Sequence, residues 1–157
     1  MKNIGAPTTK VPSGVVHSAN ITDPLEWVDP LRGYAYDSYN PDVLVRLARV
    51  KDGRVVLPGG ASYGLLVLPG ASVMNPDAGG MSAASAVKLL ELVKEGAKVV
   101  VDTTGVPGYH DLGLMGNDGA VKGVFRELLS RVMVGPYRDS TLDRVGIPRD
   151  FEGEVRV

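Results

Sequence analysis

Two apolar runs, Tyr63-Gly-Leu-Leu-Val-Leu68 and Ala97-Lys-Val-Val-Val101, decide the fold expected for this chain. Pro69-Gly70 ends the first run, and a polar stretch that begins at Asp102 ends the second. Strands that are apolar on both faces are typical of parallel sheets whose two faces are covered by helices. Between the runs, apolar residues recur at the spacing of a helix, and Gly96 follows them. The whole stretch therefore predicts a β-α-β unit with a right-handed crossover.

The segments on either side extend this unit. Toward the C-terminus, an apolar stripe predicts a helix that contains Val121 and Phe125, followed by a strand at 132–134 and a helical turn near 141–145. Toward the N-terminus, Asn40 and Pro41 are typical of a helix start. We therefore expect a flavodoxin-like α/β layer with a mostly parallel sheet.

A β-hairpin is expected to be appended to this layer. Its arms are residues 49–51 and 54–57, and they flank Asp52-Gly53. This dipeptide favours the positive φ angles of a type I′ turn. The chain of 157 residues suits one domain. We expect an N-terminal extended segment at 1–32, the α/β domain at 33–152 and a C-terminal tail at 153–157.

Composition excludes several classes of function. Seventeen Lys and Arg against eighteen Asp and Glu give a net charge of -1, which offers no electrostatic footprint for nucleic acid or an anionic membrane. The absence of cysteine removes a disulfide framework, thiolate metal ligands and a cysteine nucleophile. The sequence shows no transmembrane segment and no signal peptide, and it leaves the cellular location of the protein open. No cofactor or metal site is predicted.

Polar residues follow both apolar runs, where parallel α/β sheets usually bind ligands. Asp102 and Thr103 follow the second run, and His110 and Asp111 come shortly after. One interpretation is a small independent hydrolase that uses Asp102, Thr103 and His110, although a threonine nucleophile needs an adjacent base. The other interpretation is that Asp102 and the threonines cap backbone groups at the end of a strand. Gly79-Gly80 lacks the remaining residues of a phosphate-binding motif and is interpreted as a flexible loop.

Aromatic residues gather ahead of the first predicted helix. Trp27, Tyr34, Tyr36 and Tyr39 lie within thirteen positions. Aromatic side chains bury a large area and keep a polar edge, so they suit stacking on a sugar or docking against another domain. Packing of this segment over its own sheet is the third interpretation. The same strip would also suit self-association into a homo-oligomer.

Four stretches in order carry a resemblance to a known family. They are Gly33–Asn40, Val50–Pro58, Ala61–Pro69 and Leu142–Phe151. Together they resemble the amidotransferase-like domain of glycoside hydrolase family 106, the α-L-rhamnosidases, over residues 33–152. The resemblance implies a three-layer sandwich of the class I glutamine amidotransferase type. It also implies a bacterial origin and a role in the breakdown of polysaccharides.

Three segments of the chain differ from the patterns that this resemblance implies. In class I glutamine amidotransferases, the strand after the one that resembles Tyr63–Gly70 leads into the nucleophilic cysteine, and here Asp102–Thr104 occupies that place. The segments Ala71–Met81 and Val106–Asn117 look longer or looser than the family's pattern. The resemblance therefore implies no shared ligand contact in these two segments.

The resemblance implies an accessory rather than a catalytic role. In the family, a large (β/α)-barrel supplies the catalytic carboxylates, and such a barrel needs at least about 200 residues. No catalytic residue of the family is therefore carried onto this chain. The expected partner is therefore the catalytic barrel of a parent glycosidase, or a carbohydrate. A carbohydrate-binding module that uses Trp27, Tyr34 or Tyr36 is the alternative. Glycoside hydrolysis needs two facing carboxyl groups, and Asp37 with Asp102 is the first pair to examine.

Overall fold

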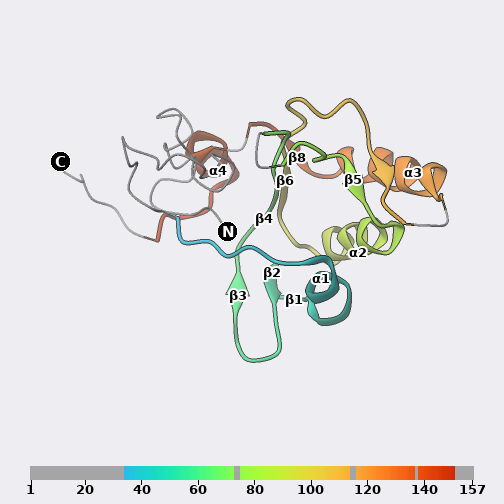
Figure 1. Ribbon diagram of the computed structural model, residues 1–157. Helices are drawn as coiled ribbons and strands as arrows, with labels where there is room; N and C mark the ends of the chain where they lie inside the picture. Colours follow the sequence, from blue (N-terminus) through green and yellow to red (C-terminus); the bar gives the residue numbers. More distant parts are fainter. Residues whose placement is uncertain (1–33, 73–74, 114–115, 137, 151–157) are drawn as a thin grey trace, which may run out of the picture.

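The structure is a computed structural model that describes residues 34–72, 75–113, 116–136 and 138–150. Its central sheet contains three parallel strands in the order β4-β6-β8 (Figure 1). The strands are β4 (Leu66–Leu68), β6 (Val99–Val101) and β8 (Met133–Val134), and the crossovers are helices α2 (Ala83–Lys94) and α3 (Asp118–Leu129). The mixed α/β class with a parallel sheet is thus confirmed. Trp27 and the expected N-terminal extended segment lie outside the described residues.

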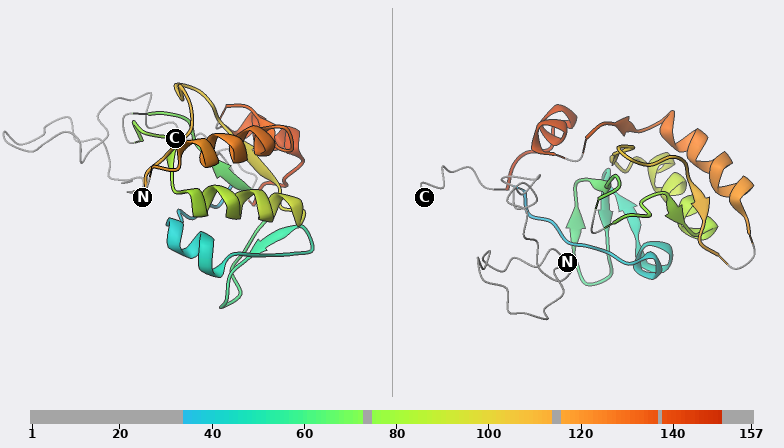
Figure 2. Two further views of the ribbon diagram at one scale, coloured as in Figure 1. Left: turned by 90° about the vertical axis from the view of Figure 1, so that its right-hand side faces the viewer. Right: turned by 45° about the horizontal axis from the view of Figure 1, so that its top comes forward.

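Helices cover both faces of the central sheet. Helices α2 and α3 lie side by side on one face, and the short helix α4 (Asp139–Val145) lies on the other (Figures 1 and 2). Because successive side chains of a strand point to opposite faces, Leu66 and Leu68 belong to the core beneath α2 and α3. Val67 packs on the opposite side, against a small cluster of Tyr34 and Leu142. This alternation explains why the whole strand is apolar.

The expected start of the first helix is confirmed. Helix α1 (Pro41–Leu47) begins after Asn40, whose side-chain oxygen accepts a hydrogen bond of 2.9 Å from the N–H of Val43. The expected end of helix α2 is also present. Gly96 follows this helix and adopts a φ of 107°, a left-handed conformation that ends the helix. Of the described residues, none belongs to a helix that is long and apolar enough to cross a membrane.

The predicted hairpin is also present. Strands β1 (Arg49–Lys51) and β2 (Arg54–Val56) pair antiparallel, with Lys51 opposite Arg54. Asp52 and Gly53 form the two-residue turn and have φ angles of 52° and 72°, as a type I′ turn requires.

One expected strand is divided between two sheets. The run from Tyr63 to Leu68 was predicted as a single strand, but only Leu66–Leu68 joins the parallel sheet. Strand β3 (Ser62–Tyr63) instead pairs antiparallel with β2. The Arg54 side chain donates hydrogen bonds to both the hydroxyl and the carbonyl of Ser62, at 2.7 and 3.1 Å. These contacts hold the start of the run to the hairpin.

A second parallel sheet replaces what was predicted as a flexible loop. Strands β5 (Gly80–Met81) and β7 (His110–Asp111) pair with each other. The interpretation of Gly79-Gly80 as a flexible loop is therefore wrong. Gly79 is buried, and a Cβ atom added there would lie only 2.1 Å from the carbonyl oxygen of Gly108. The glycine is needed because two backbone segments meet without room for a side chain.

Substitution of Gly79 by alanine should destabilise the fold. The new methyl group would force the backbone at Gly108 to move, and overpacking of this kind typically costs about 1–3 kcal/mol. Urea unfolding followed by circular dichroism measures the loss. The matched control is Gly108→Ala, because a Cβ at Gly108 meets no atom within 4 Å. Equal stability of the two variants would contradict the close approach.

Candidate functional site

The carboxyl edge of the parallel sheet is the first place to look for a site. The loop that follows β4 and the loop that follows β6 meet there and hydrogen bond to each other. The N–H of Ala71 donates to the carbonyl of Thr104 over 2.8 Å and so joins the two loops. The N–H of Asp102 donates to the carbonyl of Leu68, the last residue of β4, over 2.9 Å and so extends the pairing of the two strands. The chain's own backbone thus joins the two loops that would frame a ligand crevice.

Gly70 shows how closely the two loops approach. A Cβ atom at Gly70 would lie 2.6 Å from the carbonyl oxygen of Thr104 and 3.0 Å from Oδ1 of Asp102. Both distances are shorter than an ordinary van der Waals contact, so the position accepts only glycine. The space between the ends of β4 and β6 is therefore filled by protein atoms.

Asp102 takes part in this closure. Its Oδ1 atom accepts a hydrogen bond of 2.8 Å from the N–H of Thr104, and the residue is buried. Its carboxylate also acts on Tyr109, whose pKa is raised by burial and then by the charge of Asp102. Tyr109 in turn stacks on Phe125 of α3, with the ring centroids 3.7 Å apart. These contacts match the interpretation that Asp102 caps backbone at the end of a strand.

The other members of the predicted hydrolase trio have different partners. Thr103 is exposed, and its carbonyl accepts a hydrogen bond of 3.0 Å from Val106 in the next turn. His110 lies on β7, where its Nε2 atom is 3.2 Å from Oδ1 of Asp77. Asp102 and Thr103 thus share one loop, and His110 pairs with an aspartate that sequence analysis did not single out.

Asp111 stabilises the loop that leads into α3. Its two carboxylate oxygens accept hydrogen bonds of 2.9 Å, one from the N–H of Gly113 and one from the N–H of Asn117. These backbone donors hold the pKa of Asp111 below its usual value. Hydrogen bonds of this kind to a carboxylate are typical of a structural cap.

The structure places Asp37 and Asp102 at opposite ends of the sheet. Asp37 accepts a hydrogen bond of 2.8 Å from the hydroxyl of Tyr63, and Tyr63 precedes the amino end of β4. Asp102 follows the carboxyl end of β6, next to Leu68. Because β4 and β6 are parallel, these two carboxylates do not face each other across one sugar ring, as glycoside hydrolysis requires.

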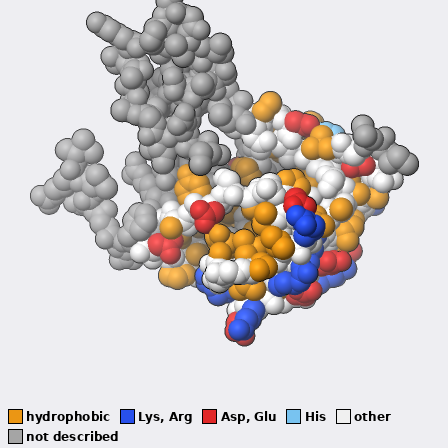
Figure 3. Space-filling view, turned by 60° about the horizontal axis from the view of Figure 1, so that its bottom comes forward, with side chains coloured by type: hydrophobic (Ala, Val, Ile, Leu, Met, Phe, Trp, Pro, Cys, Tyr) orange, Lys and Arg blue, Asp and Glu red, His pale blue; other side chains and the backbone are white. Residues whose placement is uncertain are grey.

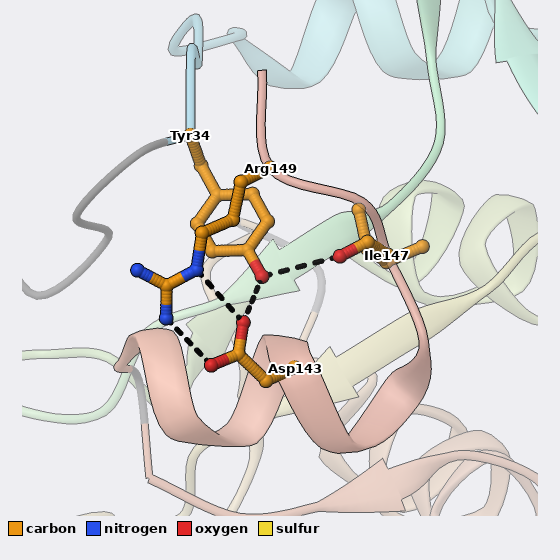
Figure 4. Close-up of polar contacts among 4 residues, drawn as sticks. All are labelled: Tyr34, Asp143, Ile147 and Arg149. Carbon is orange, nitrogen blue, oxygen red and sulfur yellow. Dashed lines mark hydrogen bonds and ion pairs between the residues drawn. The ribbon is translucent and has the colours of Figure 1, made fainter. Parts of the chain in front are cut away.

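The most extensive polar cluster around a predicted residue surrounds Tyr34 (Figure 4). The Tyr34 hydroxyl donates to the carboxylate of Asp143, and the carbonyl oxygen of Ile147 lies 3.2 Å from the same hydroxyl. Arg149 binds Asp143 through Nη2 at 2.6 Å, and its guanidinium lies 5.7 Å from the centre of the Tyr34 ring. We name Tyr34, Asp143, Ile147 and Arg149 the Tyr34 clasp.

The clasp joins the aromatic segment to the C-terminal part of the domain. Next to it, the N–H of Ala35 donates to a carboxylate oxygen of Asp150 over 2.7 Å. Tyr34 is only 6% exposed, whereas Tyr36 and Tyr39 are 43% and 40% exposed. Of the described aromatic residues in this segment, Tyr34 therefore packs onto the protein, and Tyr36 and Tyr39 face solvent.

The clasp should make the stability of the fold depend on pH in the acidic range. Hydrogen bonds from Arg149 and then from Tyr34 hold the pKa of Asp143 below its usual value. A carboxylate with a lowered folded pKa stabilises the fold above its unfolded pKa, and this contribution is lost as the pH falls through the folded pKa. Asp143→Asn should therefore reduce stability near neutral pH and should make the acid-induced loss of stability shallower.

Urea midpoints measured from about pH 7 to about pH 2 test this dependence. The matched control is Glu95→Gln at the end of α2, on the other side of the sheet. If Asp143→Asn lost stability toward acid as steeply as the unmodified protein, the carboxylate would contribute nothing to the clasp.

Within the described ranges, no group of three or more His, Cys, Asp or Glu side chains is arranged to hold a metal ion.

A comparison with known proteins identifies the family of the chain. No curated protein matches the chain. The family model described as α-L-rhamnosidase, glycoside hydrolase family 106, matches residues 17–155, which are most of the 157 residues. The chain therefore belongs to glycoside hydrolase family 106, the α-L-rhamnosidase family.

Proposed function

We propose that this chain is a noncatalytic accessory domain of a rhamnosidase-like glycoside hydrolase that acts in carbohydrate degradation. The observation that carries this proposal is the closed carboxyl edge of the sheet. The hydrogen bond from Ala71 to Thr104 and the close approach of Gly70 occupy the place where a parallel α/β enzyme would bind its substrate. The carboxylates of Asp102 and Asp111 accept hydrogen bonds from nearby backbone N–H groups, and the carboxylate of Asp143 binds Arg149 in the clasp.

A finer description of the fold belongs to the same proposal. We propose a flavodoxin-like domain of the class I glutamine amidotransferase type. Its support is the pair of β-α-β units that places α2 and α3 on one face of the sheet. In this description, Asp102–Thr104 replaces the turn that carries the nucleophilic cysteine of the amidotransferases. The replacement fits a domain that keeps the scaffold without its reaction.

The partner in this proposal is the catalytic barrel of a parent rhamnosidase. A barrel of at least about 200 residues does not fit within this chain. Tyr36 and Tyr39 are exposed and follow Tyr34 in the chain, and aromatic rings that keep a polar edge suit docking against another domain. Hydrophobic side chains also gather near the middle of the face that carries α1 and the hairpin (Figure 3). We propose that these surfaces contact the barrel.

Hydrolysis of 4-nitrophenyl α-L-rhamnopyranoside by the purified chain tests the noncatalytic role. We expect no release of nitrophenol above that of a buffer blank. Asp102→Asn is the matched variant, since it keeps the shape of the side chain and removes its charge. Turnover by the unmodified chain that disappears in Asp102→Asn would overturn the proposal and would favour the small hydrolase that uses Asp102, Thr103 and His110.

A further inference from the structure

A groove lies between helices α1 and α2 and opens to solvent. Its volume is about 420 Å³. The lining residues are Val45 of α1, Arg49 of β1, and Ala83, Ala84, Val87, Lys88 and Glu91 of α2. Helix α2 packs against both α1 and α3, so the fold of the domain holds the walls of the groove in place.

One face of α2 is left uncovered along this groove. The side chains of this face recur at the i, i+3, i+4 and i+7 spacing of a helix, and they are Ala84, Val87, Lys88 and Glu91. Val87 is 45% exposed, whereas Leu89 on the opposite face is fully buried. Because the surface ridges of one helix fit the surface grooves of another, the uncovered face suits a further helix.

Among the described residues, the charges inside the groove leave one cation without a counterion. Nζ of Lys88 lies 3.7 Å from Oε2 of Glu91, so these two charges balance each other. Arg49 is exposed, and its Nη1 atom donates a hydrogen bond of 2.8 Å to the carbonyl of Ala48. No carboxylate of the described residues forms an ion pair with Arg49. The groove therefore carries a net positive charge.

Two further cations extend this charge along the hairpin. Arg49 and Lys51 are alternate residues of β1, so their side chains leave the same face of the hairpin. Arg54 stands directly opposite Lys51, and Val55 belongs to the other face, which packs in the core. We name Arg49, Lys51 and Arg54 the basic face.

The charges of the basic face repel one another in the free domain. Like charges directly opposite each other in a sheet are destabilising. The guanidinium of Arg54 donates hydrogen bonds to Ser62, which is neutral and does not offset its charge. In the part of the chain that the structure describes, no carboxylate forms an ion pair with Lys51 or Arg54, and this includes Asp52 in the turn between them. Carboxylates of a partner would offset this repulsion, so the matching surface of the partner is expected to be acidic.

We propose that the groove and the basic face together bind an amphipathic helix with an apolar stripe and an acidic flank. The apolar stripe would lie against Val45 and Val87, where burial of apolar area is favourable. The acidic flank would meet the basic face, and this charge match would select the partner and its orientation. The identity of the helix rests on the proposed function. The outer ring of a (β/α)-barrel consists of helices, so in the parent enzyme this helix belongs to that ring.

Two synthetic peptides of opposite charge test the proposal. Each has about 18 residues, long enough to form a helix, with leucine on one stripe and alanine and glutamine on the far face. The flanking positions carry glutamate in one peptide and lysine in the other. In ¹H–¹⁵N correlation spectra of the full chain, the glutamate peptide should shift the amides of Arg49, Val87 and Lys88 in a saturable manner.

The salt dependence of binding tests the charge match. At about 10 mM salt, the lysine peptide should bind at least about tenfold more weakly than the glutamate peptide, because its charges would face the basic face. At about 500 mM salt the difference should shrink, because salt screens exposed charges.

A variant of the groove assigns the apolar contact. Val87→Ser should weaken binding of the glutamate peptide about fivefold, because it removes apolar surface from the groove. Val134→Ser is the matched control, since Val134 is 47% exposed, lies in β8 and does not line the groove. The control should bind as the unmodified chain does, and correlation spectra verify that each variant is folded.

A variant of the basic face assigns the charge contact. Lys51→Glu should weaken binding of the glutamate peptide about fivefold and should strengthen binding of the lysine peptide. Lys122→Glu is the matched control, because Lys122 is exposed on α3 and does not line the groove. It makes the same change in net charge and should leave both affinities nearly unchanged.

Several results would overturn the proposal. They are equal affinity for the two peptides at low salt, equal weakening by a variant and its matched control, and the absence of saturable shifts at these amides up to about 1 mM peptide. Self-association of the free chain that Val87→Ser abolishes would assign the groove to a second copy and would also overturn it.

Failure of this proposal is distinguishable from failure of the proposed function. Turnover of the aryl rhamnoside by the chain would overturn the noncatalytic role and would leave the groove untouched. The absence of peptide binding would remove the helix partner and would leave the noncatalytic role in place.

Discussion

Replacement of Tyr34 by alanine should lower the free energy of unfolding by about 3 kcal/mol, within the range for removal of a buried aromatic side chain. The ring is almost fully buried against Leu142, and its hydroxyl binds Asp143. The variant loses apolar contact, a hydrogen bond and the guanidinium of Arg149 over the ring together. Urea unfolding followed by the circular dichroism of the helices measures the change.

Two further variants separate the contributions to this loss. Tyr34→Phe keeps the ring and removes the hydroxyl, so it should cost about 1 kcal/mol. Tyr36→Ala is the matched control, because Tyr36 is exposed, and exposed positions usually change stability by less than about 0.5 kcal/mol. If Tyr34→Ala and Tyr36→Ala had the same stability, the clasp would not hold the aromatic segment to the domain.

Replacement of Phe125 by alanine should have the largest effect on the core, about 3–5 kcal/mol. Phe125 is 1% exposed and is among the largest fully buried side chains of the described residues. It also stacks on Tyr109, which precedes β7 and lies near the charge of Asp102. The loss should therefore extend from the core to the loop that follows β6. Thermal and urea unfolding measure it.

Val134→Ala provides the matched control for this prediction. Val134 lies in β8 and is 47% exposed, so its truncation removes little buried surface. Phe125→Leu is the intermediate variant, because leucine refills part of the space that alanine leaves empty. An equal effect of Phe125→Ala and Val134→Ala would place the core elsewhere than between α2, α3 and the central sheet.

The central β-α-β unit could be predicted because its signals are local. Apolar runs, helical spacing and Gly96 act within a few residues of each other, and Asp52-Gly53 specifies its own turn. The strand ends were harder to predict. Tyr63 and Leu66 belong to one apolar run, and only the neighbouring strands decide that Tyr63 pairs with Val55 and Leu66 with Val99. Hydrophobic pattern alone does not identify the sheet that a short segment joins.

Other features depend on contacts between distant parts of the chain. Strands β5 and β7 contain two residues each, too few for any alternation to show. The Tyr34 clasp joins residues that are 109 positions apart, and the sequence offers no pattern for that pairing. His110 was singled out, but its partner Asp77 is an ordinary loop aspartate in the sequence.

The closure of the carboxyl edge could not be predicted from the sequence either. From the sequence, Asp102 can be interpreted both as a catalytic group and as a cap, and the hydrogen bond that its carboxylate accepts from the N–H of Thr104 matches the second interpretation. The closure itself is a backbone contact between Ala71 and Thr104. Backbone hydrogen bonds between loops do not require particular residue types, so the sequence does not predict them. The exception is a close approach that requires glycine, as at Gly70.

Amide hydrogen exchange at Ala71 and Thr104, measured residue by residue by NMR, tests the central claim most directly. The claim is that the chain's own backbone closes the carboxyl edge of the sheet. We predict that both amides exchange at least about a hundredfold more slowly than in an unstructured chain, because both N–H groups donate within the closed edge. Exchange of both at the unstructured rate would mean that the loops that follow β4 and β6 stand open, and it would remove the structural basis for a noncatalytic domain.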